Sequence, residues 1–345
     1  MKAEFGRMEI FENYSLKSLN TFGVEARAKY FVQLRNEQDA KELAKTDLLR
    51  KHPYFILGGG SNVLFRDYFE GVIIQLENKG IEVAKEKNKG VKVRCAAGEG
   101  WHSFVEFCVR NDLGGLENLS LIPGKAGAAP IQNIGAYGVE QQDAFKELTA
   151  IDLMRGKLRK FKSRDCEFGY RNSYFKKNPR NPYLILNVSY QLSKEHKYNL
   201  SYGALQEHVA GKKHHDLSLQ LISDLIVDIR KSKLPDPDML GNAGSFFKNP
   251  VISAEQFRRL KSKYPEMAAY KLNERQYKIA AGWLIDKLGW KGKRKGDAGV
   301  HEKQALVIVN YGSASGEEIF NFSEGIRKDV MQHFDIGLER EVILI

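Results

Sequence analysis

The chain has 345 residues, more than a single ordinary hydrophobic core accommodates, so its length predicts two or three domains. Hydrophobic residues make up 42% and charged residues 28% of the chain, which is typical of a soluble globular protein. The sequence has no uncharged apolar run long enough to span a bilayer, and its N-terminus lacks the apolar segment of an export signal. We therefore expect a cytoplasmic protein with no membrane partner.

The cysteine and charge counts indicate the redox state of the thiols, the absence of a metal site and the class of binding partner. The three cysteines are odd in number and show neither CxxC spacing nor a nearby histidine cluster, so we expect reduced thiols and no metal site. The formal net charge of +11 fits either nucleic acid or a small polyanion such as a nucleotide diphosphate. The densest basic clusters, at 176–180 and 291–295, are short and lie among turn residues, which favours solvated loops and no nucleic-acid partner.

Hydrophobic periodicity predicts the first elements in chain order. An amphipathic helix over 38–50 precedes a buried strand over 54–57, which the three glycines at 58–60 bring to an end. Runs of β-branched residues predict further strands, and apolar spacing predicts where further helices begin: strands over 72–76, 91–97 and 183–192, and helices starting near Trp101, Ser218, Ala254 and Ala280.

The C-terminal part of the chain ends in a helix and a strand. An apolar stripe from Ile319 to Phe334 predicts a long helix that packs on a core, and residues 342–345 resemble a strand that could return to an N-terminal sheet. The proline-rich stretch 233–238 is typical of a rigid connector that enters a later domain. Because strands and helices do not follow a strict βαβ rhythm, we predict an α+β fold.

Three segments are rich in small residues. Gly58–Gly60, followed by Ser61 and Asn62, would let backbone N–H groups approach an anion, although a tight turn is the simpler explanation. Segment 123–138 has four glycines and a single charged residue, which suits either a backbone wrapped around a flat ligand or a tightly packed interior crossing. Segment 241–250 presents Ser245 ahead of two phenylalanines; it is not a GxSxG nucleophile elbow, and alone it indicates a turn serine.

Six motifs that occur in a fixed order are, taken together, specific to one protein family. They are LGGGSNVL at 57–64, PIQNIGAYG at 130–138, FGYR at 168–171, LPDP at 234–237, GNAGSFFKNP at 241–250 and AAGWLID at 280–286. The chain closely resembles the UDP-N-acetylenolpyruvoylglucosamine reductase (UDP-N-acetylmuramate dehydrogenase) family from about Asn20 to Glu341. Residues 200–205 resemble the substrate-covering tyrosine loop of its longer, type I subclass.

This resemblance implies a two-part FAD-binding module of the vanillyl-alcohol-oxidase (PCMH) type and a C-terminal α+β substrate-binding domain. FAD-binding subdomain 1 would comprise 1–70 and 336–345, subdomain 2 would comprise 71–222, and the UDP-sugar domain would comprise 223–335. FAD would be noncovalent, because no His/Cys pair offers itself for attachment. The residues expected to hold it are Gly58, Gly59, Gly60, Ser61, Asn62, Pro123, Gly124, Gly127, Ile131, Gln132, Asn133, Gly135, Ala136 and Tyr137.

The implied reaction reduces UDP-N-acetylglucosamine enolpyruvate to UDP-N-acetylmuramate with NADPH as hydride source, a step that serves peptidoglycan synthesis, cell shape and cell division. Flavin N5 would deliver hydride to the enolpyruvyl methylene carbon, and Ser245 would protonate the adjacent carbon. Arg171 would stabilise the developing enolate with a permanently charged guanidinium. Glu341 would donate a hydrogen bond if burial keeps it protonated, and Glu339 is the neighbouring alternative on the same strand face.

The resemblance also implies which residues contact the substrate. The UDP-sugar would lie against Tyr137, Tyr202, Lys233, Asn249, Tyr270, Lys278 and Gln304, with Lys233 equally explained as a linker charge. Ile343 stands where the family often has an arginine, so that contact is absent or supplied elsewhere.

Three alternatives to this reductase function stay open: an FAD oxidase of another substrate, a basic nucleic-acid-binding protein, and an inactive relative. A monomer is the default expectation.

Overall fold

The structure, a computed structural model, describes residues 2–5, 8–85, 90–178, 181–211 and 213–345. The chain divides into two compact units, each assembled from stretches that are separate in sequence. Unit 1 comprises 1–14, 28–59 and 70–232, and unit 2 comprises 15–27, 60–69 and 233–345. The last crossing between the units falls at the start of the predicted connector 233–238. The division into three domains stays a prediction.

Unit 1 contains two five-stranded sheets. In the first the strand order is β1-β2-β3-β6-β4, and the strands are β1 (Lys2–Phe5), β2 (Met8–Ser15), β3 (Arg27–Leu34), β6 (Phe69–Leu76) and β4 (Tyr54–Leu57). Strand β4 matches the predicted strand, and it pairs in parallel with β6, where Ile56 lies opposite Ile74. Side chains of β6 are buried on both faces, which explains its nearly continuous apolar sequence.

The second sheet of unit 1 is antiparallel, with the order β12-β11-β13-β8-β7. Its strands are β12 (Lys157–Lys162), β11 (Phe145–Asp152), β13 (Tyr183–Ser193), β8 (Gly90–Ala96) and β7 (Ile81–Lys85). Helix α3 (Trp101–Arg110) buries Trp101 and Phe104 against Tyr190 of β13, with ring centroids 5.8 and 5.5 Å from the tyrosine. The buried Tyr190 hydroxyl donates to the side chain of Gln141, which satisfies its polar group.

Shorter elements complete unit 1. Between β8 and β11 the chain forms α4 (Ala129–Gln132), β9 (Gly135–Ala136) and β10 (Val139–Glu140). Between β12 and β13 it forms α5 (Ser163–Cys166) and α6 (Tyr174–Lys177). Helix α7 (Gly203–Val209) precedes α8 (Leu219–Lys233), the helix that the sequence predicts near Ser218. Leu205 of α7 packs with Ile222 and Ile226 of α8 in a small apolar cluster.

The helix predicted over 38–50 is two helices, α1 (Glu37–Lys45) and α2 (Leu48–Lys51). Thr46 interrupts it because its hydroxyl donates to the carbonyl of Leu43 at 2.8 Å and accepts from the N–H of Leu48. Threonine offers the backbone an alternative to the helical hydrogen bond, so the apolar spacing continues while the helix does not.

Unit 2 contains a four-stranded and a three-stranded antiparallel sheet and a two-stranded parallel pair. The four-stranded sheet has the order β14 (Gly241–Ser245), β20 (Val307–Asn310), β19 (Ala298–Val300) and β18 (Arg294–Lys295). The three-stranded sheet has the order β15 (Val251–Ser253), β17 (Gln276–Ile279) and β16 (Ala269–Asn273). The parallel pair consists of β21 (Ile343–Leu344) and β5 (Val63–Leu64). The C-terminal strand therefore does return to an N-terminal segment, in a pair separate from the large N-terminal sheet.

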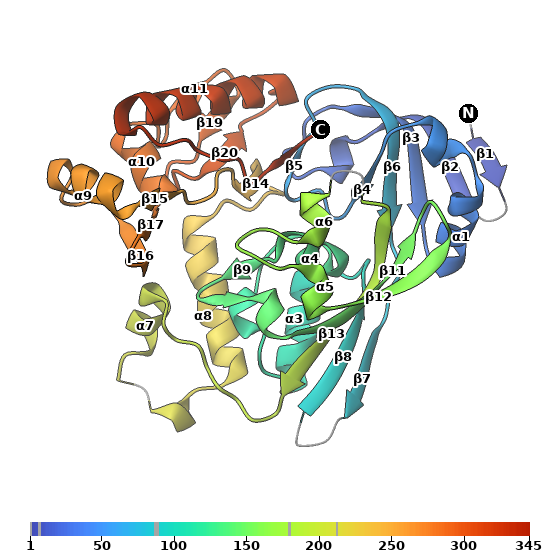
Figure 1. The fold of residues 1–345 in the computed structure, drawn as a ribbon, viewed down its shortest axis with the longest axis horizontal. Coiled ribbons are helices and arrows are strands. Elements are labelled where there is room, and N and C mark those ends of the chain that lie inside the picture. Colours follow the sequence, from blue (N-terminus) through green and yellow to red (C-terminus); the bar gives the residue numbers. More distant parts are fainter. Residues whose placement is uncertain (1, 6–7, 86–89, 179–180, 212) are drawn as a thin grey trace. The chain divides into compact units, whose positions relative to one another are not determined.

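Three helices accompany these sheets: α9 (Ala254–Lys263), α10 (Ala281–Lys287) and α11 (Gly316–Phe334). Helix α11 lies over β19 and β20 (Figure 1). It begins with a capping box between Ser315 and Glu318, and its predicted apolar stripe is buried: Ile319, Phe322, Ile326, Val330 and Phe334 are each at most 6% exposed. The mixture of helices with mainly antiparallel strands confirms the predicted α+β class.

Among the described residues no helix combines the length and apolarity that a membrane crossing requires. Within the same ranges no group of three His, Cys, Asp or Glu side chains is arranged to hold a metal ion.

The stripe of α11 leads to a stability prediction. Ile326→Ala removes a fully buried side chain, so we expect the free energy of unfolding to fall by about 2–5 kcal/mol. Met331→Ala, on the same helix but 52% exposed, is the matched control and should change it by less than about 0.5 kcal/mol. Urea denaturation monitored by circular dichroism measures both, and equal losses would show that the stripe does not pack on the core.

Candidate functional site

Glycines at two loops of unit 1 allow a close backbone approach. A Cβ added at Gly59 would lie 2.9 Å from the Cα of Gly124, and one at Gly127 would lie 2.5 Å from the Cβ of Ala97. The single charged residue of segment 123–138, Lys125, forms a 2.7 Å ion pair with Glu77 in the same unit. Chain packing therefore accounts for Gly59 and Gly127, as the interior-crossing interpretation of this segment expects.

The same segment leaves apolar surface uncovered. Ile131, Ile134, Ala136 and Tyr137 pack against the core of unit 1 or the small cluster beside it, yet each remains partly accessible. A partly exposed apolar patch on a backbone of small residues suits a flat aromatic ring with a polar tail. These residues therefore fit FAD, although Gly59 and Gly127 are themselves used for packing.

The remaining residues of the glycine turn belong to unit 2. Gly60 has a φ of +67°, and a Cβ there would lie 1.9 Å from the carbonyl oxygen of Leu19, so no other residue fits this position. Ser61 follows as a partly exposed residue. The side-chain amide of Asn62 donates to the backbone carbonyl of Glu341 at 3.1 Å, so this predicted cofactor residue supports a predicted catalytic one.

Asn133 forms a buried hydrogen-bonding centre in unit 1. Its Nδ2 donates to Glu140 Oε2 at 2.7 Å and to the carbonyl of Gly169 at 3.1 Å. Its Oδ1 accepts from the side chain of Gln141 and from the backbone N–H of Gln142. Asn133 has a φ of +45°, which asparagine tolerates better than most residues. The amide thus ties segment 123–138 to the segment that carries Arg171.

Arg171 is anchored at both ends. Its backbone has a φ of +52° and lies inside a tight turn in which Gly169 and Asn172 exchange N–H to carbonyl bonds. Its guanidinium Nη2 donates to the carbonyl of Gly135 at 2.5 Å, next to the predicted cofactor residue Ala136. A Cβ at Gly135 would lie 3.1 Å from Arg171 Nη1, so glycine makes room for this contact. The structure therefore brings Arg171 to the small-residue segment.

Tyr137 and Tyr202 meet edge to face. Their ring centroids lie 4.9 Å apart at an interplanar angle of 77°, and Tyr202 is 43% exposed. Tyr137 has a φ of +50°, and its carbonyl accepts from the side chain of Asn118 at 2.9 Å. Burial raises the pKa of the Tyr137 phenol, while the positive charge of Arg230 acts in the opposite direction. Sequence reasoning did not identify Arg230, which belongs to none of the recognised motifs.

In unit 2 the segments that carry Ser245 and Glu341 are joined through Phe246. Ser245 ends β14 opposite Val307 of β20, after a bulge that includes Gly244 with a φ of +66°. The backbone N–H of Glu341 donates to the carbonyl of Phe246 at 2.9 Å, immediately after the serine. Phe246 and the next residue, Phe247, are at most 1% exposed. The turn serine is therefore held rigidly between a paired strand and two buried rings.

Glu339 has a different partner from Glu341. Its carboxylate forms a 2.5 Å ion pair with Lys248, and its side chain is 72% exposed. The backbone carbonyl of Glu339 also accepts from the N–H of Lys248. Glu339 is thus a surface ion pair, which leaves Glu341 as the better candidate of the two carboxyls.

The predicted substrate residues of unit 2 form two groups. Asn249 Oδ1 accepts from the N–H of Ala281 at 2.9 Å, and Gln304 Oε1 would lie 3.5 Å from a Cβ at Gly282, so both lie at the start of α10. Tyr270 and Lys278 are opposite each other on β16 and β17, with the ammonium 5.9 Å from the ring centroid. Lys233, the last residue of α8, is exposed.

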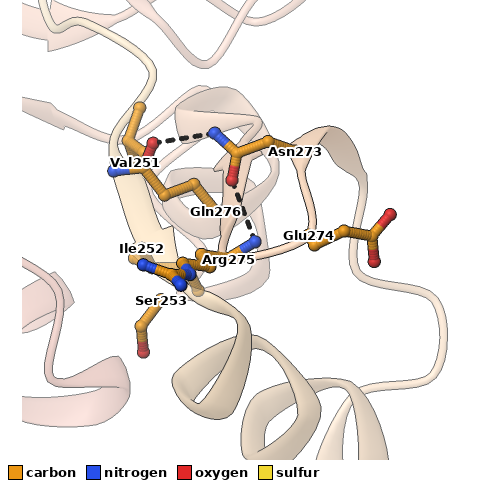
Figure 2. Close-up of a pocket in the computed structure, with 7 residues that line it drawn as sticks. All are labelled: Val251, Ile252, Ser253, Asn273, Glu274, Arg275 and Gln276. Atoms are coloured by element: carbon orange, nitrogen blue, oxygen red, sulfur yellow. Dashed lines mark hydrogen bonds between the residues drawn. The ribbon is translucent and has the colours of Figure 1, made fainter.

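A pocket on the three-stranded sheet lies beside the second group (Figure 2). It is lined by Val251, Ile252, Ser253, Asn273, Glu274, Arg275 and Gln276. Asn273 closes the turn by donating to Gln276 Oε1 and accepting from the N–H of Arg275. None of the predicted site residues lines this pocket, although Val251 pairs with Lys278 across the sheet.

Comparison with known proteins gives the family. A model of the C-terminal domain of UDP-N-acetylenolpyruvoylglucosamine reductase matches residues 236–345, and a model of an FAD-binding domain matches 28–162. The reductase of Flavobacterium johnsoniae is 46% identical over 98% of this chain and 100% of its own length. The chain belongs to the UDP-N-acetylenolpyruvoylglucosamine reductase family.

Other reductases of this family show the same coverage. That of Pseudomonas putida is 44% identical over 96% of this chain and 97% of its own length. The crystal structure of the Thermus caldophilus UDP-N-acetylenolpyruvylglucosamine reductase has a TM-score of 0.65 over 99% of both chains, at 23% identity, and shows a shared fold. These findings confirm an FAD-binding module followed by a C-terminal domain of this reductase family, and they make the chain a flavin oxidoreductase.

The Asn133 centre leads to a prediction about stability and pH. Asn133→Asp replaces the donating NH₂ by an oxygen that faces Glu140 and the Gly169 carbonyl, so two hydrogen bonds become repulsive contacts. We expect a loss of about 2–4 kcal/mol of unfolding free energy at neutral pH. The new carboxyl is buried beside a carboxylate, which raises its pKa, so the loss relative to wild type should shrink as the pH falls and the group binds a proton.

Thermal unfolding of both proteins at pH 8 and pH 5.5 measures this difference. Asn111→Asp is the control, because Asn111 also donates to a backbone carbonyl but is exposed. A deficit in Asn133→Asp that is as small as the control's would show that the amide does not hold the two segments together.

Proposed function

We propose that the chain catalyses the FAD-dependent reduction of UDP-N-acetylglucosamine enolpyruvate to UDP-N-acetylmuramate, with NADPH as the hydride source. The observation that carries this proposal is the backbone hydrogen bond that joins Glu341 to Phe246, the residue after Ser245, within a chain that is 46% identical to a named reductase over nearly its whole length. The reaction would serve peptidoglycan precursor synthesis, and with it cell shape and division, in the cytoplasm.

The residues that would hold FAD noncovalently come from the glycine turn and the small-residue segment. Ile131, Ala136 and Tyr137 offer the partly exposed apolar surface, and Gly58 and Gly135 add no side chain of their own. FAD supplies the redox chemistry of such an enzyme, by accepting hydride from NADPH and passing it to the substrate. Asn133 holds this surface in one conformation through its buried amide.

Ser245 would give a proton to the substrate carbon next to the one that receives hydride. A serine hydroxyl is a weak acid, so it serves only where a strongly basic carbanion-like centre is held within reach. The strand pairing of Ser245 and the buried rings that follow restrict its motion and meet the positional demand. Gly244 lets the chain bulge just before the serine, which sets the direction of its side chain.

Arg171 and Glu341 would stabilise the charge that develops on the carboxylate side of the substrate. Arg171 is held to the Gly135 carbonyl by one nitrogen, and the rest of its planar fork is suited to an oxyanion. Glu341 is fixed through its own N–H and carbonyl by Phe246 and Asn62, so its carboxyl needs no further backbone adjustment. A protonated Glu341 would act as a hydrogen-bond donor to the same charge.

The UDP-sugar would be bound by three kinds of side chain: lysines, amides and tyrosines. Lysines suit its diphosphate, amides suit its uracil, and tyrosines cover apolar faces; the residues proposed are Tyr137, Tyr202, Lys233, Asn249, Tyr270, Lys278 and Gln304. We further propose that the protein works as a monomer and takes no nucleic-acid partner.

Replacing the serine tests the proton step. Ser245→Ala keeps the backbone but removes the hydroxyl, so flavin bleaching by NADPH should be unchanged while reoxidation by the UDP-enolpyruvyl sugar slows by about 10² to 10⁴ fold. Anaerobic stopped-flow absorbance separates the two half-reactions. Ser262→Ala, an exposed serine on α9, is the control and should behave as wild type.

The outcomes distinguish the proposals. Reoxidation of Ser245→Ala at the wild-type rate would remove Ser245 from the proton step. A wild-type flavoprotein that NADPH bleaches but the sugar does not reoxidise would point to an oxidase of another substrate. A colourless protein that cannot be reconstituted with FAD would contradict the proposed function as a whole.

A further inference from the structure

Arg230 is a largely shielded cation, partly accessible as a whole residue, that the proposed reaction has not used. It lies in the last turn of α8, and its Nε atom is shielded from solvent and has no hydrogen-bond partner among the described residues. Its guanidinium interacts with the phenol of Tyr137, in the same unit. Buried donors in native proteins are almost always paired, so an orphaned guanidinium nitrogen calls for a partner that the chain does not supply.

The charge of Arg230 is also uncompensated. Across the described ranges no carboxylate forms an ion pair with it, and the groups that act on it are the Tyr137 phenol and a second cation, Arg171. Burial lowers the pKa of Arg230, and the neighbouring Arg171 lowers it further. A desolvated cation next to another cation is costly unless an anion joins them.

A purely structural role accounts for part of this arrangement. Arg230 is close to the C-terminal end of α8, where a cation interacts favourably with the helix dipole, and it supports the strained Tyr137. Neither task uses Nε, and neither requires the side chain to be buried. Methionine or leucine would fill the volume without the cost of a desolvated charge.

The donors around Arg230 are also fixed in place. Ile226 and Ile229 on the same helix are buried, which immobilises the turn that carries Arg230. Tyr137 is held by the Asn118 hydrogen bond to its carbonyl and by its edge contact with Tyr202. Donors that need no reorganisation are the kind that bind a developing or resident negative charge well.

We propose that Arg230, together with the Tyr137 hydroxyl, binds an anionic oxygen of a ligand. The oxygen belongs either to the UDP-sugar, as a carboxylate or phosphate oxygen, or to the reduced isoalloxazine ring, whose added negative charge a nearby cation stabilises. The inference rests on the proposed function for the identity of the ligand. It rests on the orphaned Nε and the uncompensated charge for the site itself.

Three variants test the proposal in the FAD-loaded protein. Arg230→Met removes the charge and keeps the volume, Arg230→Lys keeps a charge but removes Nε, and Lys231→Met removes the adjacent exposed charge as the control. Two quantities are measured: the Kd of the UDP-enolpyruvyl sugar, from the perturbation of flavin absorbance, and the midpoint potential of the flavin. Flavin content and thermal unfolding are recorded for each variant.

If the oxygen belongs to the sugar, Arg230→Met raises its Kd by about 10 to 100 fold and leaves the potential unchanged, because a charged hydrogen bond is lost. If it belongs to the flavin, the potential becomes more negative and the Kd is unchanged. Arg230→Lys should fall between Arg230→Met and wild type, and Lys231→Met should match wild type. Should Arg230→Met fail to fold or to retain flavin, Arg230→Lys decides by the same two measurements.

Wild-type values of both Kd and potential in a flavin-containing, folded Arg230→Met protein would overturn the proposal, as would an effect of Lys231→Met of the same size. A wild-type protein that does not bind the sugar would contradict the proposed function instead. In that case the midpoint potential alone still tests whether Arg230 faces an anionic oxygen.

Discussion

The buried amide of Asn133 supports much of the predicted site in unit 1. It is 0% exposed and makes hydrogen bonds to Glu140, Gly169, Gln141 and Gln142, so both of its polar atoms are satisfied without water. A satisfied buried amide is rigid, because moving any one partner leaves a polar group unpaired in a dry interior. This centre fixes the conformation of the small-residue segment on one side and of the turn that carries Arg171 on the other.

The two units supply different chemical elements of the proposed reaction. Unit 1 contains the partly exposed apolar patch and the cations Arg171 and Arg230, which suit a flat cofactor and negative charge. Unit 2 contains Ser245 and Glu341, whose backbones share a hydrogen bond through Phe246. The chain passes from unit 1 to unit 2 after Gly59, and a Cβ at Gly59 or at Gly60 would meet neighbouring backbone, so both positions require glycine.

The sequence predicts the regular elements well where one periodicity dominates. The stripe of α11 and the apolar run of β4 are local patterns, and the structure confirms both. The break at Thr46 escaped prediction because it depends on a side-chain hydroxyl that competes with the helix, not on apolar spacing. Motif order was sufficient to identify the family, since six matched segments are far more specific than any one of them.

Site details that depend on tertiary contacts were less accessible. The sequence predicts Glu339 and Glu341 on the same strand face, but strand β21 begins only at Ile343, and the pairing of Glu339 with Lys248 separates the two carboxyls. For Gly59 and Gly127 the sequence leaves both ligand contact and close chain packing open, and only the structure shows the close packing. Arg230 lies 93 positions after its partner Tyr137 (230 − 137) and outside every motif, so no local pattern could indicate it.

The positive charge on strand β12 affects how the protein could aggregate. It is an edge strand of the second sheet of unit 1, and its exposed side chains include Lys157, Arg159, Lys160 and Lys162. An edge strand presents unpaired backbone groups that another chain could extend into a longer sheet. A second copy that added its own β12 would bring two rows of cations together, and their repulsion disfavours that pairing. The basic edge thereby protects the enzyme from aggregating through its own sheet.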